Sequence, residues 1–257
     1  MAMNPDLPAW PDCRVWIIGA STGIGAATAR ALLDAGARVA LSARRADALA
    51  DVAQDHTNAT VVPLDFTDSV AVRKGWTTLV AEWGRVDLVL VVAGTHQEMR
   101  AWELDEAKAM ALLKTNLHGV ISACSVIVPA LLAQGRGAIG IVGSVAGYRG
   151  LPKALIYGAS KAAVINFTES LYLDLEPKGL GVYLISPGFV KTPLTDHNDF
   201  KMPALISAEE AADEILRGLR KGQFEIHFPR RFTRMLKLMQ LLPYRWYFSL
   251  IHRSTGL

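Results

Sequence analysis

Cysteine is scarce in this sequence: Cys13 and Cys124 are the only two among 257 residues. A disulfide framework requires a regularly spaced set of cysteines, and a zinc site requires Cys and His ligands at short spacing. The sequence has neither pattern. We therefore interpret both thiols as reduced residues packed inside the protein, and we expect no metal centre.

The chain also lacks a linker rich in Pro, Gly or Ser, a low-complexity tract and a fixed-period repeat. It is 51% hydrophobic and 20% charged, which is typical of a soluble globular protein with a large core. The length would suit two small domains, but nothing in the sequence separates them. Residues 1–13 have no basic segment followed by an apolar one, as a secretory signal would have. We expect one main domain and a cytoplasmic protein.

Acidic residues are missing after Glu225, although the net charge of the whole chain is only +3. The same stretch carries six basic side chains, Arg230, Arg231, Arg234, Lys237, Arg245 and Arg253. Without these six, the remaining 21 basic residues face 24 acidic ones, and residues 1–225 have a net charge of −3. The basic character of the protein therefore belongs to its C-terminal extension.

Short apolar runs alternate with helix-like segments from residue 14 onward. The runs cover 14–19, 38–42, 60–64, 86–92, 138–143, 181–186 and 224–228. The helix-like segments cover 23–35, 46–54, 68–83, 104–134 with a possible break, 155–176 and 208–221. This alternation predicts an α/β fold, a single Rossmann-type doubly wound parallel sheet of about seven strands flanked by helices. Functional loops should follow the carboxyl ends of the strands.

A glycine-rich turn follows the first predicted strand, with the sequence Gly19-Ala20-Ser21-Thr22-Gly23-Ile24-Gly25. Glycines there allow a tight bend and a close approach to a pyrophosphate, which the N-terminus of the next helix favours. The spacing is G-x-x-x-G-x-G, and a tight turn without a ligand is the alternative. The position after strand one favours a dinucleotide site.

Two arginines, Arg44 and Arg45, follow the second predicted strand. An acidic residue at this place would bind the free 2′-hydroxyl of NAD(H), whereas an arginine would pair with the 2′-phosphate of NADP(H). The sequence therefore favours NADP(H) as cofactor. The alternative is a solvated arginine pair at the start of the next helix.

Tyr157 and Lys161 are four residues apart in a predicted helix and so share one face of it. A phenol has a reference pKa of about 10, and a nearby ammonium should lower it by favouring the phenolate. Ser144 follows the fifth strand, and Asn116 stands within a predicted long helix, where asparagine is unfavourable. Each residue also has an ordinary structural explanation, but together they indicate proton-transfer chemistry.

The glycine turn, Asn116, Ser144 and the Tyr157-x-x-x-Lys161 pair resemble, in this order, the motifs of the short-chain dehydrogenase/reductase family, in particular its classical branch. The resemblance spans residues 12 to 228. It implies that Tyr157 is the general acid in reduction and that Ser144 hydrogen-bonds the substrate oxygen. It further implies that Lys161 holds the nicotinamide ribose and that Asn116 holds a water that links Lys161 to solvent.

The resemblance also implies further cofactor contacts and a homo-oligomer, a dimer or tetramer formed through 104–134 and 155–176. Asp65 and Phe66 would lie near the adenine, although Asp65 could equally cap the helix that begins around Asp68. The nicotinamide contacts would be Pro187, Gly188, Val190 and Thr192. The family usually has Asn-Asn-Ala-Gly after strand four, where this sequence has Val91-Val92-Ala93-Gly94. Ala93 and Gly94 can still approach the cofactor through their backbone.

The predicted substrate walls are mainly apolar and come from loops 95–102, 145–156 and 193–206. An apolar carbonyl or alcohol is therefore the expected substrate. His96 lies in the first of these loops, where a lone histidine is more often a surface residue than a catalytic one.

Residues 229–257 are predicted to begin with a basic amphipathic helix that ends near Pro243, followed by aromatic residues around Arg245. No uninterrupted apolar run in this segment could span a bilayer. The segment fits an anionic membrane surface, or it packs on the domain or on a second subunit. Nucleic acid is not the expected partner, because large apolar residues interrupt the basic ones.

We therefore predict a catalytic domain at 1–228, a helical extension at 229–257, and an NADP(H)-dependent oxidoreductase that interconverts a carbonyl and a secondary alcohol. The alternative is a dinucleotide-binding regulatory or scaffold protein at a membrane surface with little turnover. The intact Asn116, Ser144, Tyr157 and Lys161 favour the enzyme.

Overall fold

The computed structural model describes residues 2–54, 56–195 and 202–255. Seven parallel strands form one sheet in the order β3-β2-β1-β4-β5-β6-β7. The strands are β1 (Arg14–Ile18), β2 (Arg38–Ser42), β3 (Ala59–Val61), β4 (Leu88–Val91), β5 (Ala138–Val142), β6 (Gly181–Pro187) and β7 (Glu225–Phe228). The predicted Rossmann-type α/β fold is confirmed.

Burial on both faces explains why the inner strands read as continuous apolar runs. Every residue of β4, β5 and β6 is buried. The edge strand β3 is shorter than the predicted 60–64, because regular pairing with β2 ends at Val61 and Pro63 cannot donate a hydrogen bond. The chain order reverses beside β1, whose neighbours are β2 and β4. Ligands bind at this type of switch point, beyond the carboxyl ends of the strands.

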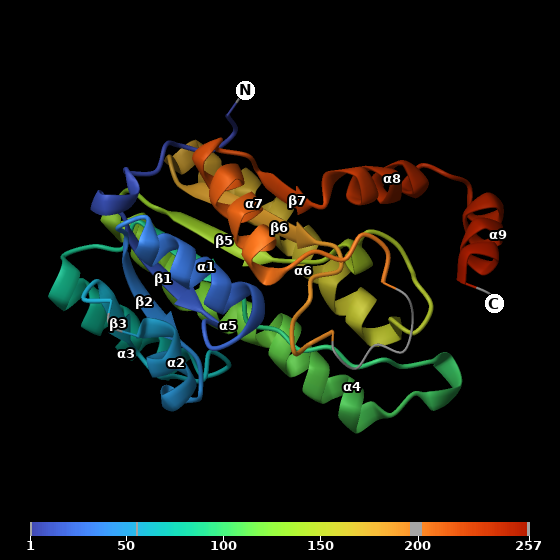
Figure 1. The fold of residues 1–257 in the computed structure, drawn as a ribbon, viewed down its shortest axis with the longest axis horizontal. Coiled ribbons are helices and arrows are strands. Elements are labelled where there is room, and N and C mark those ends of the chain that lie inside the picture. Colours follow the sequence, from blue (N-terminus) through green and yellow to red (C-terminus); the bar gives the residue numbers. More distant parts are fainter. Residues whose placement is uncertain (1, 55, 196–201, 256–257) are drawn as a thin grey trace.

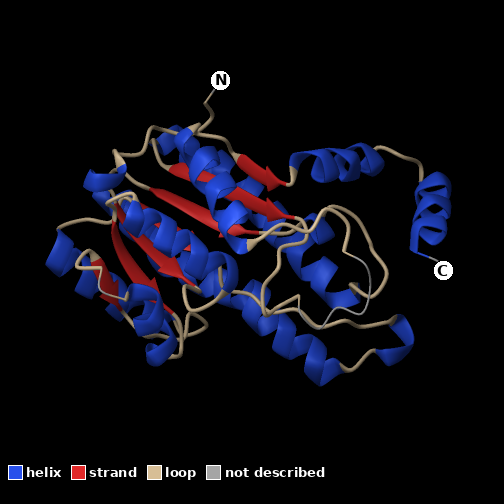
Figure 2. Ribbon diagram, viewed as in Figure 1, coloured by secondary structure: helices blue, strands red, loops and turns tan. Residues whose placement is uncertain are grey.

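Helices cover both faces of the sheet (Figures 1 and 2). Helices α1 (Gly23–Asp34), α2 (Ala46–Ala53) and α7 (Ala208–Arg220) contribute to one buried apolar cluster. The opposite cluster contains side chains from α3 (Ser69–Trp83), α5 (Gly119–Gln134) and α6 (Leu155–Leu175). The two helical layers bury the sheet and leave the loops at its carboxyl edge to form a site.

The predicted helix at 104–134 is continuous but irregular. It consists of α4 (Glu106–Leu113), a π-helical turn η3 (Lys114–His118) and α5. By length and apolarity, Glu106–Gln134 could cross a membrane, but half of its most apolar window is buried inside the protein. Its packing against the sheet accounts for this apolarity. The π-turn takes the place of the predicted break and positions Asn116, which is fully buried.

The C-terminal extension forms two helices, α8 (Arg230–Gln240) and α9 (Tyr244–Thr255). Helix α8 matches the predicted amphipathic helix, whereas α9 was not anticipated. Figure 1 shows both helices reaching beyond the sheet, with α9 farthest from it. The division between a catalytic domain and an extension at residue 228 stays a prediction.

Candidate active site

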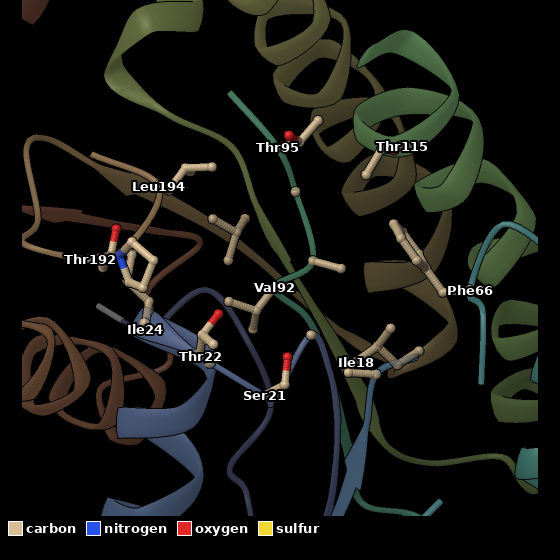
Figure 3. Close-up of a pocket in the computed structure, with 18 of the residues that line it drawn as sticks. Ile18, Ser21, Thr22, Ile24, Phe66, Val92, Thr95, Thr115, Thr192 and Leu194 are labelled. Atoms are coloured by element: carbon tan, nitrogen blue, oxygen red, sulfur yellow. The ribbon is translucent and has the colours of Figure 1, made fainter. Parts of the chain in front are cut away.

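A cavity of about 870 Å³ opens at the carboxyl edge of the sheet and is lined from both sides of the switch point (Figure 3). All the predicted cofactor residues line this cavity, and Ser144 lines it with them. These residues are Gly19, Ser21, Thr22, Gly23, Ile24, Gly25, Arg44, Arg45, Asp65, Phe66, Ala93, Gly94, Tyr157, Lys161, Pro187, Gly188, Val190 and Thr192. The structure thus brings them together, while their individual binding roles stay predictions.

The glycine turn between β1 and α1 is too crowded for side chains at two positions. A Cβ on Gly25 would lie 2.0 Å from the carbonyl oxygen of Gly19, and one on Gly19 would lie 2.4 Å from the backbone nitrogen of Ala93. Gly19 also has a φ of +98°, which other residues rarely adopt. Figure 3 shows the hydroxyl groups of Ser21 and Thr22 directed into the cavity. The turn therefore presents backbone and hydroxyl groups at the start of α1.

Val91 and Val92 stand where the family usually has two asparagines. Apolar packing and backbone hydrogen bonds hold this part of the chain in place. Val91 is buried in one core cluster, and Val92 packs against the other. The backbone N–H groups of Val92 and Ala93 both donate to the carbonyl oxygen of Ile18, at 2.8 and 3.0 Å. The junction of β1 and β4 is therefore held without the two amide side chains. Ala93 stays beside the glycine turn, as the sequence predicts.

Arg44 and Arg45 follow β2 and are exposed at one end of the cavity. Asp65 lies near Arg44, but its Oδ1 already accepts hydrogen bonds from the backbone N–H of Thr67 at 2.9 Å and from the hydroxyl of Thr67 at 2.8 Å. These bonds, together with the charge of Arg44, hold the pKa of Asp65 below its usual value. This end of the cavity therefore carries two positive arginine side chains. Its carboxylate, Asp65, is ionised and already hydrogen-bonded to Thr67.

Asp65 does not cap α3. The N-cap is Asp68, whose side chain accepts a hydrogen bond from the backbone N–H of Val70 at 2.8 Å. The neighbouring Phe66 is buried and its ring lies against Gly119 of α5, where a Cβ would come within 2.5 Å of the ring. Phe66 is thus both a cavity wall and a packing residue.

Tyr157 lies in the first turn of α6, and Ser144 lies two residues after the end of β5. Burial raises the pKa of the Tyr157 phenol, and its side-chain hydrogen bond with Ser144 offsets only part of this effect. The Ser144 oxygen also accepts a hydrogen bond from the backbone N–H of Ala146 at 3.1 Å, which fixes its position. A phenol that is protonated at neutral pH thus stands beside a fixed hydroxyl.

Lys161 lies one turn after Tyr157 and is buried. Its ammonium donates a hydrogen bond to the carbonyl oxygen of Val142 at 2.9 Å and lies 5.9 Å from the centre of the Tyr157 ring. Burial lowers the pKa of Lys161 to about 8. The predicted lowering of the Tyr157 pKa is wrong for this arrangement, because burial raises that pKa and the ammonium is directed at a backbone carbonyl.

Asn116 explains the irregular turn in the long helix. Its side chain donates to the carbonyl oxygen of Thr95 at 2.8 Å and accepts from the backbone N–H of Thr95 at 2.8 Å. Its amide also donates to the Ser160 hydroxyl at 3.3 Å. A Cβ on Gly94 would lie 3.5 Å from both the Asn116 Oδ1 and the Lys161 Nζ. Asn116 therefore secures the loop after β4 beside Lys161.

The loop position of His96 favours a surface residue, but the structure places it against Tyr157. The ring centroids are 4.6 Å apart and the planes are at 78°, an edge-to-face contact. Burial lowers the pKa of His96, and its buried Nδ1 has no hydrogen-bond partner in the described part of the chain. No sequence signal identified this contact, because a loop position carries no periodicity that predicts which side chain it meets.

The substrate side of the cavity is formed partly by loops that contact one another. The backbone N–H of Met99 donates to the carbonyl oxygen of Lys153 at 2.9 Å, and the Met99 side chain is buried. This contact joins the loop after β4 to the segment before α6. From the third predicted loop, Leu194 lines the cavity, whereas residues 196–201 lie outside the described part of the chain.

Comparisons with known proteins bear on the family and the fold of this chain. A family model described as short chain dehydrogenase matches residues 14–202. An uncharacterized oxidoreductase of Myxococcus xanthus (strain DK1622) is 36% identical over 232 residues, covering 88% of this chain and 91% of that protein. The NAD(+)-dependent 2-dehydro-3-deoxy-L-rhamnonate dehydrogenase of Sphingomonas sp. (strain SKA58) is 34% identical over 181 residues, covering 70% and 73%. The solved structure of ElxO with NADP bound has a TM-score of 0.75 at 22% identity, covering 84% of this chain and 97% of ElxO.

Proposed function

The chain belongs to the short-chain dehydrogenase family of oxidoreductases, and we propose that it is an NADP(H)-dependent enzyme that interconverts an apolar ketone and a secondary alcohol. The observation that carries this proposal is the position of Tyr157 and Ser144 in the same cavity as Arg44 and the glycine turn. One cavity thus provides a proton donor, an oxygen-binding hydroxyl and a positively charged end.

The residues around the cavity fit a nicotinamide dinucleotide. The turn from Gly19 to Gly25 leaves no room for a Cβ at either end, so its backbone can lie against a pyrophosphate. Thr192 lies over this turn, with its methyl group 3.1 Å from the position of a Cβ on Gly23. Lys161 and Thr192 would contact the nicotinamide end. When bound, the nicotinamide supplies or accepts the hydride.

Arg44 and Arg45 support NADP(H) rather than NAD(H). An arginine beside the adenine ribose pairs with a 2′-phosphate through charge-assisted hydrogen bonds, whereas a free 2′-hydroxyl is usually bound by a carboxylate. The nearby carboxylate, Asp65, is already engaged with Thr67. The Sphingomonas relative uses NAD(+) and ElxO binds NADP, so the preference is inferred from these residues and not from the relatives.

Tyr157 acts as the proton donor in reduction and as the acceptor in oxidation. In reduction, its phenolic proton passes to the carbonyl oxygen while the carbonyl carbon receives the hydride. Ser144 donates a hydrogen bond to the same oxygen and stabilises the negative charge that develops there. Because burial raises the pKa of the phenol, Tyr157 carries its proton at neutral pH, and Lys161, whose ammonium donates to the carbonyl oxygen of Val142, serves to hold the nicotinamide ribose.

The cofactor assignment is tested by replacing Arg44 with alanine and measuring kcat/KM for NADPH and NADH with a panel of apolar ketones. We expect the NADPH value to fall about 10- to 100-fold, as for the loss of a charged hydrogen-bonded pair, and the NADH value to change little. Arg30→Ala is the matched control, since Arg30 is an exposed arginine of α1 that does not line the cavity. Equal losses for both cofactors would contradict the assignment.

A further inference from the structure

The two C-terminal helices expose an unusual amount of apolar surface. On α8 and directly after it, Met235, Leu238 and Leu241 are spaced three residues apart along an exposed face, and Leu238 is 67% and Leu241 82% exposed. On and around α9, the exposed large side chains are Tyr244, Trp246, Phe248 and Leu250, with Trp246 at 65%. Monomeric proteins rarely expose so many neighbouring large apolar residues without a binding partner.

Contacts with the domain hold the two helices in a fixed position. Arg149 donates from Nη1 to the carbonyl oxygens of Met239, Gln240 and Leu242, at 2.9, 3.2 and 2.7 Å. Its guanidinium also lies 4.0 Å from the centre of the Tyr247 ring. The hydroxyl of Tyr247 donates to the carbonyl oxygen of Gly150 at 2.8 Å. One side of α8 and α9 therefore contacts the domain, and the apolar side chains on the other side face the solvent.

Positive charge accompanies this apolar surface. Of the six basic residues after Glu225, Arg230 pairs with Glu214, and Lys237 pairs with Glu225. The other four are exposed and form no ion pair within the described part of the chain; they are Arg231, Arg234, Arg245 and Arg253. Tryptophan and tyrosine beside exposed arginines are the composition of segments that lie at a membrane interface.

The short helix η2 (Ala101–Glu103) and the residue after it expose further apolar groups, with Trp102 78% and Leu104 58% exposed. Figure 1 shows this segment, just before α4, at the same end of the molecule as α9. This is the end toward which the carboxyl ends of the strands point. Apolar groups therefore flank the side of the molecule where the cavity lies.

We propose that α8 and α9 dock the protein on an anionic lipid surface. The helices have 11 and 12 residues, and a helix needs about 20 to cross a bilayer, so they would lie in the plane of the interface. A symmetric contact between two copies of the extension would instead bring together two segments that each carry four unpaired arginines and, after Glu225, no acidic residue to neutralise them. Negative lipid headgroups complement this charge, and the exposed leucines and aromatics enter the adjacent apolar layer.

The test is flotation of the full-length protein with vesicles of phosphatidylcholine, with or without phosphatidylglycerol. We expect binding to the anionic vesicles, weakened by salt, and much weaker binding to the neutral ones. The double variant Arg234→Gln/Arg245→Gln should reduce the affinity for anionic vesicles about 25-fold, roughly fivefold per removed charge. Binding that is equal on both vesicles and insensitive to this variant would overturn the proposal.

A second double variant, Leu241→Ser/Trp246→Ser, removes exposed apolar groups without touching the cavity. It should lose vesicle binding while keeping the thermal stability and ketone turnover of the wild type. Val70→Ser is the matched control, because Val70 is 72% exposed on α3, and it should bind vesicles like the wild type. Light scattering distinguishes a second copy as the occupant: a wild-type dimer that this double variant converts to a monomer would overturn the proposal.

Discussion

Burial of Lys161 should make the protein less stable than it would be with an apolar residue there. The ammonium is buried, and its hydrogen bond to the carbonyl oxygen of Val142 is its one side-chain hydrogen bond in the described structure. Methionine has a similar length and no charge. We therefore predict that Lys161→Met abolishes turnover but stabilises the fold at neutral pH.

The size of this effect follows from the pKa of Lys161, which burial lowers from 10.5 to about 8. At pH 7 this difference corresponds to a destabilisation of roughly 3 kcal/mol relative to a neutral side chain. Removing the ammonium leaves the Val142 carbonyl without its partner, which costs about 1 to 2 kcal/mol. The net gain is about 1 to 2 kcal/mol, or roughly 3 to 6 °C in Tm for a chain of this size.

The pH dependence gives a sharper test than the stability at one pH. Because the folded-state pKa is lowered, the unfolded chain binds more protons between pH 8 and 10.5, and the wild type gains stability as the pH rises through this window. The destabilisation is complete below pH 8 and shrinks to about 1 kcal/mol at pH 10. The advantage of Lys161→Met should therefore disappear or reverse by pH 10.

Urea unfolding of both proteins at pH 7, 8.5 and 10 measures this difference. Titration of Tyr157 affects both proteins alike and largely cancels in the comparison. Lys178→Met serves as the control, since Lys178 is exposed and its replacement should leave the difference near zero at each pH. A Lys161→Met protein that is less stable at pH 7, or a difference that does not change with pH, would refute the argument.

Two further predictions concern the cavity. Tyr157→Phe should retain NADPH binding, measured by fluorescence titration, and lose turnover by roughly 10²- to 10⁴-fold, because it removes the proton donor and little else; full turnover would exclude Tyr157 as the donor. Gly25→Ala should weaken NADPH binding and lower Tm, because its Cβ would lie 2.0 Å from the Gly19 carbonyl oxygen and displace the turn; unchanged affinity in the same titration would show that the turn does not contact the cofactor.

The sheet was predictable because its physical cause is visible in the sequence. Strands buried on both faces must be apolar throughout, so the seven runs stood out between longer helical segments. The π-turn at Lys114–His118 was not predictable from the same pattern, since α5 is apolar on most of its surface and has no distinct apolar stripe whose shift would reveal an extra residue. Only the presence of Asn116 in a helix indicated that something irregular was needed there.

The sequence does not predict α9, because Pro243 indicates the end of α8 and gives no sign of a second helix. The same proline precedes a new helix, and its carbonyl oxygen accepts from the backbone N–H of Tyr247 at 3.0 Å. Aromatic residues have modest helix propensity, so the cluster around Arg245 did not indicate a helix. Contacts with Arg149 hold α9 in place, and such tertiary contacts cannot be deduced from a local sequence pattern.

Lys161 beside Tyr157 is a second case in which a tertiary contact could not be deduced from the local sequence. Spacing on a helix correctly placed both residues on one face, but the pKa of the phenol depends on where the ammonium is directed and on how deeply both groups are buried. The structure directs the ammonium to Val142 on β5. The Tyr157 pKa is therefore raised because the phenol is buried and the ammonium is bound to a strand of the sheet. The spacing of Tyr157 and Lys161 along the helix contains no information about either contact.

The segment after β5 connects the chemistry to the C-terminal extension. It begins with Ser144, which hydrogen-bonds Tyr157, and five residues later it reaches Arg149, which holds the end of α8. Between them, Tyr148 donates a hydrogen bond to Glu225, the same carboxylate that pairs with Lys237 of α8. Burial alone would raise the pKa of Glu225, but these two partners keep it below its usual value, so the link is ionic at neutral pH. An extension docked on lipid would therefore fix the orientation of the cavity relative to the membrane through this short segment.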